Sequence, residues 1–102
     1  MSALEQILDE RGNRYGRFDH HAEVTQALKG VMRGDMAKLT SEVSVNLGSA
    51  WDDLCPDQKE TLEMIVHKIG RVLNGDPDYV DSWADIAGYA KLVADRLEGV
   101  SR

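Results

Sequence analysis

Four carboxylates in the C-terminal half are spaced as ligands of a single cation would be. Glu60 and Glu63 are three residues apart, and Asp81 and Asp85 are four apart, so each pair shares one face if its segment is helical. Hard cations such as Mg²⁺ take oxygen ligands and keep waters that a substrate phosphate can replace. The spacing predicts a magnesium site held by these four side chains. Exposed charges that favour the helix dipole are the alternative interpretation.

Two basic side chains, Lys68 and Arg71, follow Glu60 and Glu63 on the same predicted helix. On a helical wheel, Glu60, Glu63, His67 and Arg71 lie within about 80° of one another, with Lys68 to one side. An arginine binds phosphate as a bidentate fork, and a lysine binds it as a point charge. Lys68 and Arg71 are therefore the candidates for holding the phosphate oxygens of a ligand beside the metal. If the ligand is hydrolysed, the same two cations would neutralise the phosphate charge that develops.

A second basic group surrounds one tyrosine. It consists of Arg11, Arg14, Tyr15 and Arg17. The glycines at 12 and 16 predict a loop over residues 11–17, which places a local positive charge in an acidic chain. We expect Arg11 and Arg14 to contact an anionic ligand, with Tyr15 or Tyr89 stacking on a base. A solvated loop without a ligand is the alternative.

Two further reactive residues are weaker candidates. His21 falls on an apolar helical face, where a core histidine is more common than a metal ligand. Cys55 precedes a proline at a cap position and has no histidine beside it in the sequence to activate its thiol. We therefore expect His21 in the core and Cys55 as a buried or inert thiol.

Four main helices must position these side chains. Ser2 with Glu5 predicts a capping box, Asp19 an N-cap, and Pro56 with Gly75 a start and a stop. The helices are expected at residues 2–10, 19–34, 56–74 and 81–97. Residues 35–55 are expected to form an irregular excursion. Within it, 35–50 could also be helical, whereas a lone strand would have no pairing partner.

The last two helices carry the predicted core. Apolar side chains recur at helical spacing on both, which predicts a helix hairpin over 56–98 with two buried stripes. The stripes are Leu62, Ile65, Val66, Ile69, Val72 and Leu73 on the first helix, and Trp83, Ile86, Ala87, Ala90, Val93, Ala94 and Leu97 on the second. The chain is thus predicted to be a single all-α domain over 1–102, a helical bundle.

Composition excludes several classes of protein. The chain has 102 residues, one cysteine, and 12 basic against 18 acidic residues, a net charge of −6. No apolar run reaches the ~18 residues of a membrane span, and the N-terminus does not resemble a signal peptide. The acidity argues against binding to a nucleic-acid backbone. We expect a cytoplasmic protein with a small-molecule partner, no nucleic acid and no membrane.

Three segments resemble a family of small phage and prophage proteins of unknown function. They are ERGNRYG at 10–16, KIGR at 68–71 and DSWADIAGYA at 81–90. This family in turn resembles the MazG-like all-α nucleoside triphosphate pyrophosphohydrolases, which bind Mg²⁺ through E-x-x-E on one helix and E-x-x-D on the next. Glu60 and Glu63 match the first motif. Asp81 and Asp85 depart from the second in spacing, and the first acid is shorter.

The resemblance implies a nucleotide-binding protein in a bacterial host cell that hydrolyses its ligand with Mg²⁺. It also implies a dimer or tetramer that completes the bundle, with Trp51 and Leu92 as candidate interface residues. Because the second motif departs from the pattern, the alternative is a non-catalytic protein that sequesters a nucleotide signal. A further alternative is an inhibitor of a host factor that acts through an acidic helical surface.

Overall fold

The computed structural model describes residues 2–35, 37 and 39–101, and this part of the chain contains five helices and no strand. The helices are α1 (Ala3–Tyr15), α2 (Phe18–Met32), α3 (Ser41–Asp53), α4 (Pro56–Asn74) and α5 (Val80–Leu97). The predicted all-α class is confirmed. The predicted number of four main helices is wrong, because residues 41–53 form a helix of their own.

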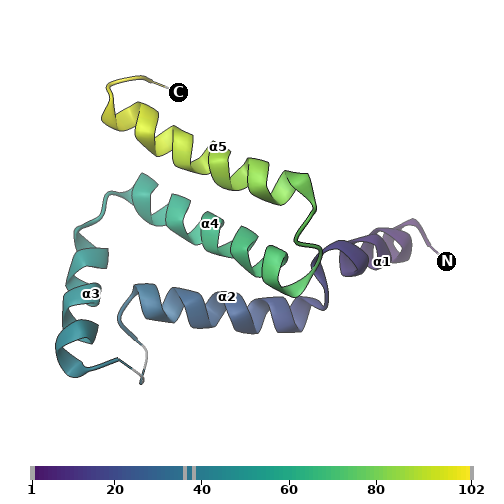
Figure 1. The fold of residues 1–102 in the computed structure, drawn as a ribbon, viewed down its shortest axis with the longest axis horizontal. Coiled ribbons are helices and arrows are strands. Elements are labelled where there is room, and N and C mark those ends of the chain that lie inside the picture. The colour runs from purple at the N-terminus through teal and green to yellow at the C-terminus, as the bar shows by residue number, and fades with distance from the viewer. Residues whose placement is uncertain (1, 36, 38, 102) are drawn as a thin grey trace.

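Three of the helices form a single layer. Figure 1 shows α2, α4 and α5 side by side, with α4 in the middle. Helix α3 crosses one end of the layer, and α1 projects from the other end. The molecule measures 50 × 39 × 22 Å, so its thinnest dimension is about two helix diameters. A layer of this kind leaves both of its faces open.

The hairpin of α4 and α5 follows its sequence signals closely. Pro56 is the first residue of α4, and Gly75 caps the other end. The predicted bounds 56–74 and 81–97 are therefore correct to within one residue. Cys55 is the N-cap of α4 and its backbone N–H donates to the Gln58 side chain. The thiol is exposed, so the prediction of a buried thiol is wrong.

The N-terminal helices differ from their predicted bounds. Ser2 caps α1 by accepting from the Glu5 backbone N–H, as expected. The helix nevertheless continues through the predicted loop 11–17 as far as Tyr15, because one interior glycine costs only about 1 kcal/mol. The stop is Gly16, whose φ of 76° suits glycine. Asp19 is not an N-cap; it lies in the first turn of α2.

Of the two interpretations of residues 35–50, the helical one is confirmed for its main part, and the irregular excursion over 35–55 is wrong there. Thr40 accepts a hydrogen bond from the Val43 backbone N–H and starts α3, which ends at Asp53. Sequence alternation over 43–45 resembles a strand, but the Thr40 cap and the packing of α3 against α2 favour the helix. Residues 36 and 38 belong to the predicted excursion and lie outside the described residues.

The predicted core is not buried in a single chain. Val66 is the only apolar side chain among the described residues that is buried, whereas five polar ones are: His21, Thr25, Lys68, Ser82 and Asp95. Five members of the stripe predicted for α5 are exposed: Trp83, Ala87, Ala90, Ala94 and Leu97. The reason is geometric, since α4 is the only helix in the described part of the chain with which α5 packs extensively.

Candidate functional site

The turn between α1 and α2 is anchored to the end of α4. The Asn74 side chain donates to the carbonyls of Tyr15 and Arg17, both at 2.9 Å. A Cβ at Gly16 would lie 2.1 Å from the Asn74 carbonyl oxygen, and one at Gly75 would lie 2.1 Å from that of Arg14. Two glycines therefore allow the backbones to cross here, and the crossing holds α1 against α4.

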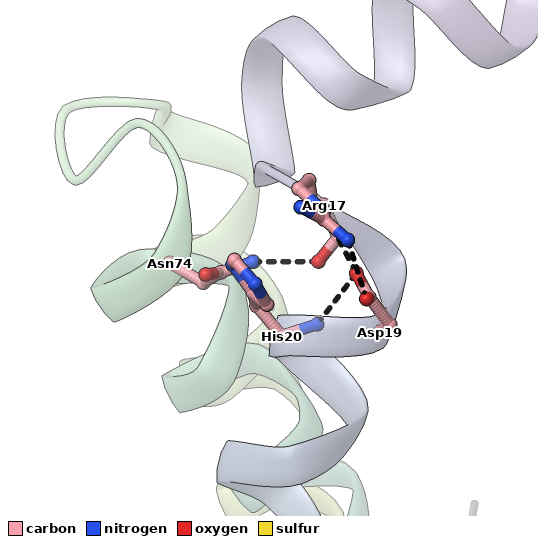
Figure 2. A network of polar contacts seen from close by, with 4 residues as sticks. All are labelled: Arg17, Asp19, His20 and Asn74. Carbon is pink, nitrogen blue, oxygen red and sulfur yellow. Dashed lines mark hydrogen bonds and ion pairs between the residues drawn. The ribbon is translucent and has the colours of Figure 1, made fainter.

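Figure 2 shows the polar contacts on the outer side of this crossing. The Arg17 guanidinium donates twice to Asp19, at 3.0 and 2.7 Å, and Asp19 also accepts from the His20 backbone N–H. The arginine holds the pKa of Asp19 below its usual value. Arg17 is thus already paired with a carboxylate, although it lies in the predicted basic group.

A cavity of about 490 Å³ lies beside this crossing, between α1, α2 and α4. Its volume is within the range of small-molecule sites, roughly 300–1,000 Å³. Its walls combine cationic, imidazole and aromatic side chains: Arg11, Tyr15, Phe18, His21, His67 and Arg71. None of the residues that line it is acidic. In a chain of net charge −6, the cavity is a local exception.

Arg71 and Tyr15 form one wall of the cavity. The guanidinium carbon lies 4.1 Å from the centre of the tyrosine ring, a cation–π contact that fixes the planar group. Neither Arg71 nor Arg11 takes part in an ion pair within the described part of the chain. The two cations are therefore available for an anionic ligand.

Two histidines in contact also line the cavity. His21 Nε2 and His67 Nδ1 are 3.2 Å apart, and the rings meet edge to face. Burial, and then the charge of Arg71, lower the pKa of both imidazoles, that of His67 to about 4. Both rings are thus neutral at pH 7, and the hydrogen bond between them needs one ring to donate and the other to accept.

Gly70 brings α2 and α4 close enough for this contact. A Cβ at position 70 would lie 2.6 Å from Thr25 Cγ2 and 2.9 Å from His21 Cε1. Any larger residue would push the two helices apart. The prediction that His21 is a core residue is confirmed, since it is 5% exposed.

The four carboxylates predicted to bind Mg²⁺ share no common partner, and three of them contact other side chains. Glu63 accepts from Arg33 at 2.6 Å, Asp85 pairs with Lys68 at 3.0 Å, and Asp81 accepts from the Tyr79 hydroxyl at 2.9 Å. Glu60 lines a separate cavity of about 620 Å³ between α4 and α5. Across residues 2–35, 37 and 39–101, no three acidic, histidine or cysteine side chains gather as a metal site would require.

The predicted phosphate-binding residues divide between two places. Arg11, Tyr15 and Arg71 come together at the cavity beside α1. Lys68 does not join them, because it is buried against Asp85 on the α5 side of α4. Tyr89 lines the separate cavity with Glu60.

Arg14 points away from the cavity towards the start of α5. It donates to the Tyr79 hydroxyl at 3.3 Å, and its guanidinium lies 4.9 Å from that ring. The same hydroxyl donates to Asp81, which raises the pKa of Tyr79. Arg14 therefore connects α1 to the loop before α5.

Sequence reasoning missed three residues of this site: Phe18, His67 and Asn74. Phe18 is largely exposed and stacks on His21 at the mouth of the cavity. His67 was placed on the polar face of its helix without a role. The available signal was a phenylalanine directly after Arg17, next to the basic group and at the predicted start of a helix.

Comparison of the chain with family models, curated proteins and solved structures finds no match. The resemblance to the phage family and to the MazG-like enzymes therefore stays a prediction. None of the described helices has the length and apolar character needed to cross a membrane.

Proposed function

We propose that the protein binds a nucleotide or another phosphate-bearing small molecule in the cavity between α1, α2 and α4. The observation that carries the proposal is a site-sized cavity walled by two arginines without carboxylate partners and by aromatic rings. Arg11 and Arg71 would bind the phosphate oxygens, because guanidinium groups match them bidentately. Tyr15 and Phe18 would contact the apolar or aromatic part of the ligand.

Non-catalytic binding agrees best with the placement of the charged groups. Three of the four acids predicted to hold Mg²⁺ contact Arg33, Lys68 or Tyr79, and none of the four lines this cavity. A ligand here would be held by fixed positive charge alone. This corresponds to the alternative in which the protein sequesters a nucleotide signal.

Calorimetry with pyrophosphate and with adenosine diphosphate tests the proposal, with and without EDTA. We expect binding that chelation leaves unchanged. Arg71→Gln should weaken it at least 10-fold, since a hydrogen bond to a charged group contributes about 1.5–3 kcal/mol. Arg96→Gln is the matched control, because Arg96 lies at the other cavity and pairs with Asp57.

Two results would contradict the proposal. One is no heat of binding with either compound at millimolar concentration. The other is loss of binding in Arg96→Gln but not in Arg71→Gln, which would move the site to the cavity between α4 and α5.

Magnesium-dependent hydrolysis is the second candidate, favoured by the four carboxylates and the MazG-like resemblance. It requires Glu63 and Asp85 to leave their present partners. Incubation with a panel of nucleoside triphosphates and Mg²⁺ distinguishes it from binding alone. Release of pyrophosphate that Asp81→Asn and Asp85→Asn abolish would establish catalysis.

A further inference from the structure

The hairpin of α4 and α5 has two faces of opposite character. Two cavities lie along it and share Thr61 and Val93. One is lined by Glu60 and Leu92, the other by Leu62 and Ala90. Residues two apart on a helix lie about 200° apart, so the two cavities open on opposite sides of the hairpin.

The side with Leu62 and Ala90 is continuous and apolar. We call it the apolar face; it consists of Leu62, Ile65, Ile69 and Leu73 of α4, and Trp83, Ala87, Ala90, Ala94 and Leu97 of α5. On α5 the spacing is four, three, four and three residues, the spacing of a helix that packs along a seam. Yet Trp83 is 55% exposed, Leu97 64% and Leu73 70%.

A single chain exposes more surface than a folded monomer of its size. Its accessible surface is 7120 Å², whereas a monomer of 11.3 kDa is expected to expose about 5,700 Å². The radius of gyration is 16.2 Å against about 13 Å for a compact chain of this length. The surplus of roughly 1,400 Å² exceeds the ~800 Å² that each partner buries in a standard interface.

We propose that the apolar face is the interface of a homodimer, in which two α4–α5 hairpins pack face to face as a four-helix bundle. The second copy supplies what one chain lacks, since Val66 is the only buried apolar side chain in the described part. Three alanines on α5 allow the helices to approach closely. The same patch on both chains makes the contact self-complementary around a two-fold axis.

Charge and geometry favour a second copy over a membrane surface. Interfacial helices that bind anionic lipid carry Lys and Arg on their polar side, whereas this chain has a net charge of −6. The cavity with Arg71 is not part of the apolar face, so dimerisation would leave it open. Leu92 lies on the opposite side of the hairpin and would not be an interface residue.

The test is the mass of the full chain in solution, by sedimentation velocity or light scattering between 1 and 100 µM. We expect twice 11.3 kDa for the unmodified protein. Ala90→Glu should raise the dissociation constant at least 100-fold, because it buries an unpaired charge in the interface. Ala84→Glu is the matched control, because Ala84 is exposed on α5 outside the apolar face; it should remain dimeric.

A second variant and a second measurement keep the proposal falsifiable. Leu97→Glu is in the last turn of α5 and tests the same face if Ala90→Glu does not fold. The midpoint of thermal unfolding should rise with concentration in the unmodified protein and not in either variant. A monomer at 100 µM, or dimers in both Ala90→Glu and Leu97→Glu, would overturn the proposal.

Discussion

Helix α4 contacts α2 and α5 in different ways. Towards α2 it presents Gly70, with His21 and Thr25 filling the space where a side chain would be. Towards α5 it presents longer side chains, and a cavity lies on each side of the contact, of about 620 and 310 Å³. One helix thus makes a contact centred on a glycine and polar side chains on one side, and a contact flanked by two cavities on the other.

The difference suggests separate tasks for the two helix pairs. The close approach of α2 and α4 holds the histidines and Arg71 in fixed positions at the candidate ligand site. The pair of α4 and α5 leaves apolar side chains that one chain does not bury. We therefore expect substitutions in the first pair to act on the folded chain itself, and those on the apolar face to act through association.

The largest effect is expected from Gly70→Ala. The added methyl group would lie 2.6 Å from Thr25 Cγ2, so α2 and α4 must move apart. We expect a loss of about 2 kcal/mol in the free energy of unfolding, measured with urea. Thr25→Ser removes the opposing methyl group, and in the double variant it should restore part of the loss. If Gly70→Ala is as stable as the unmodified protein, the close approach is not present in solution.

Acid should weaken the same helix pair. The fold lowers the pKa of His67 to about 4, mainly by burial, so between pH 6.5 and about 4 the unfolded chain binds more protons than the folded chain. Stability therefore falls as pH falls through this window. We expect the free energy of unfolding to fall by about 1–2 kcal/mol across this window. This is less than the full change in pKa corresponds to, because the His67 ring is partly exposed.

Urea unfolding at pH 7.0, 6.0 and 5.0 measures this dependence. His67→Gln should flatten it, because glutamine does not titrate. His20→Gln is the control, since His20 is exposed and lies outside the His21–His67 contact. If the free energy of unfolding depends equally on pH in all three proteins, the His21–His67 pair is not the cause of the acid sensitivity.

The pair of α4 and α5 depends in part on one ion pair. Lys68 is 8% exposed and its ammonium group lies 3.0 Å from Asp85. Removing the carboxylate leaves a buried charge without its partner, so Asp85→Asn should cost about 1 kcal/mol. Asp19→Asn breaks an exposed pair with Arg17 and should produce no measurable change in urea unfolding. Equal losses in the two variants would contradict this ranking.

Local signals allowed the hairpin to be predicted almost completely. Pro56 determines the start of α4 through backbone geometry alone. Gly75 marks its end, and this glycine also allows the close approach of Arg14 and Tyr15. The predicted loop around Gly12 failed because a single glycine lowers helix propensity without ending a helix. Gly16 ends α1, and its role follows from a close approach to Asn74 that is distant in the sequence.

The site could be predicted only in part for a similar reason. Helical spacing placed Glu60, Glu63 and Arg71 on one face of α4, but spacing does not reveal which neighbouring helix that face meets. Arg33 of α2 reaches Glu63, and Tyr15 of α1 reaches Arg71, over 30 and 56 positions of sequence. The burial of the α5 stripe was predicted wrongly because a helical stripe shows that a surface is apolar, not which chain covers it.

The smallest effect is expected from Gly88→Ala, and it has the opposite sign to Gly70→Ala. A Cβ at Gly88 would meet no atom within 4 Å, and alanine is favoured over glycine in a helix by about 0.8–1.0 kcal/mol. Gly88→Ala should therefore raise the free energy of unfolding by about that amount. Gly88 lies outside the apolar face, so the gain should be the same at 2 and 100 µM protein. A loss of stability that grows with concentration would place position 88 inside a contact between copies, and would mean that α5 associates through a different side.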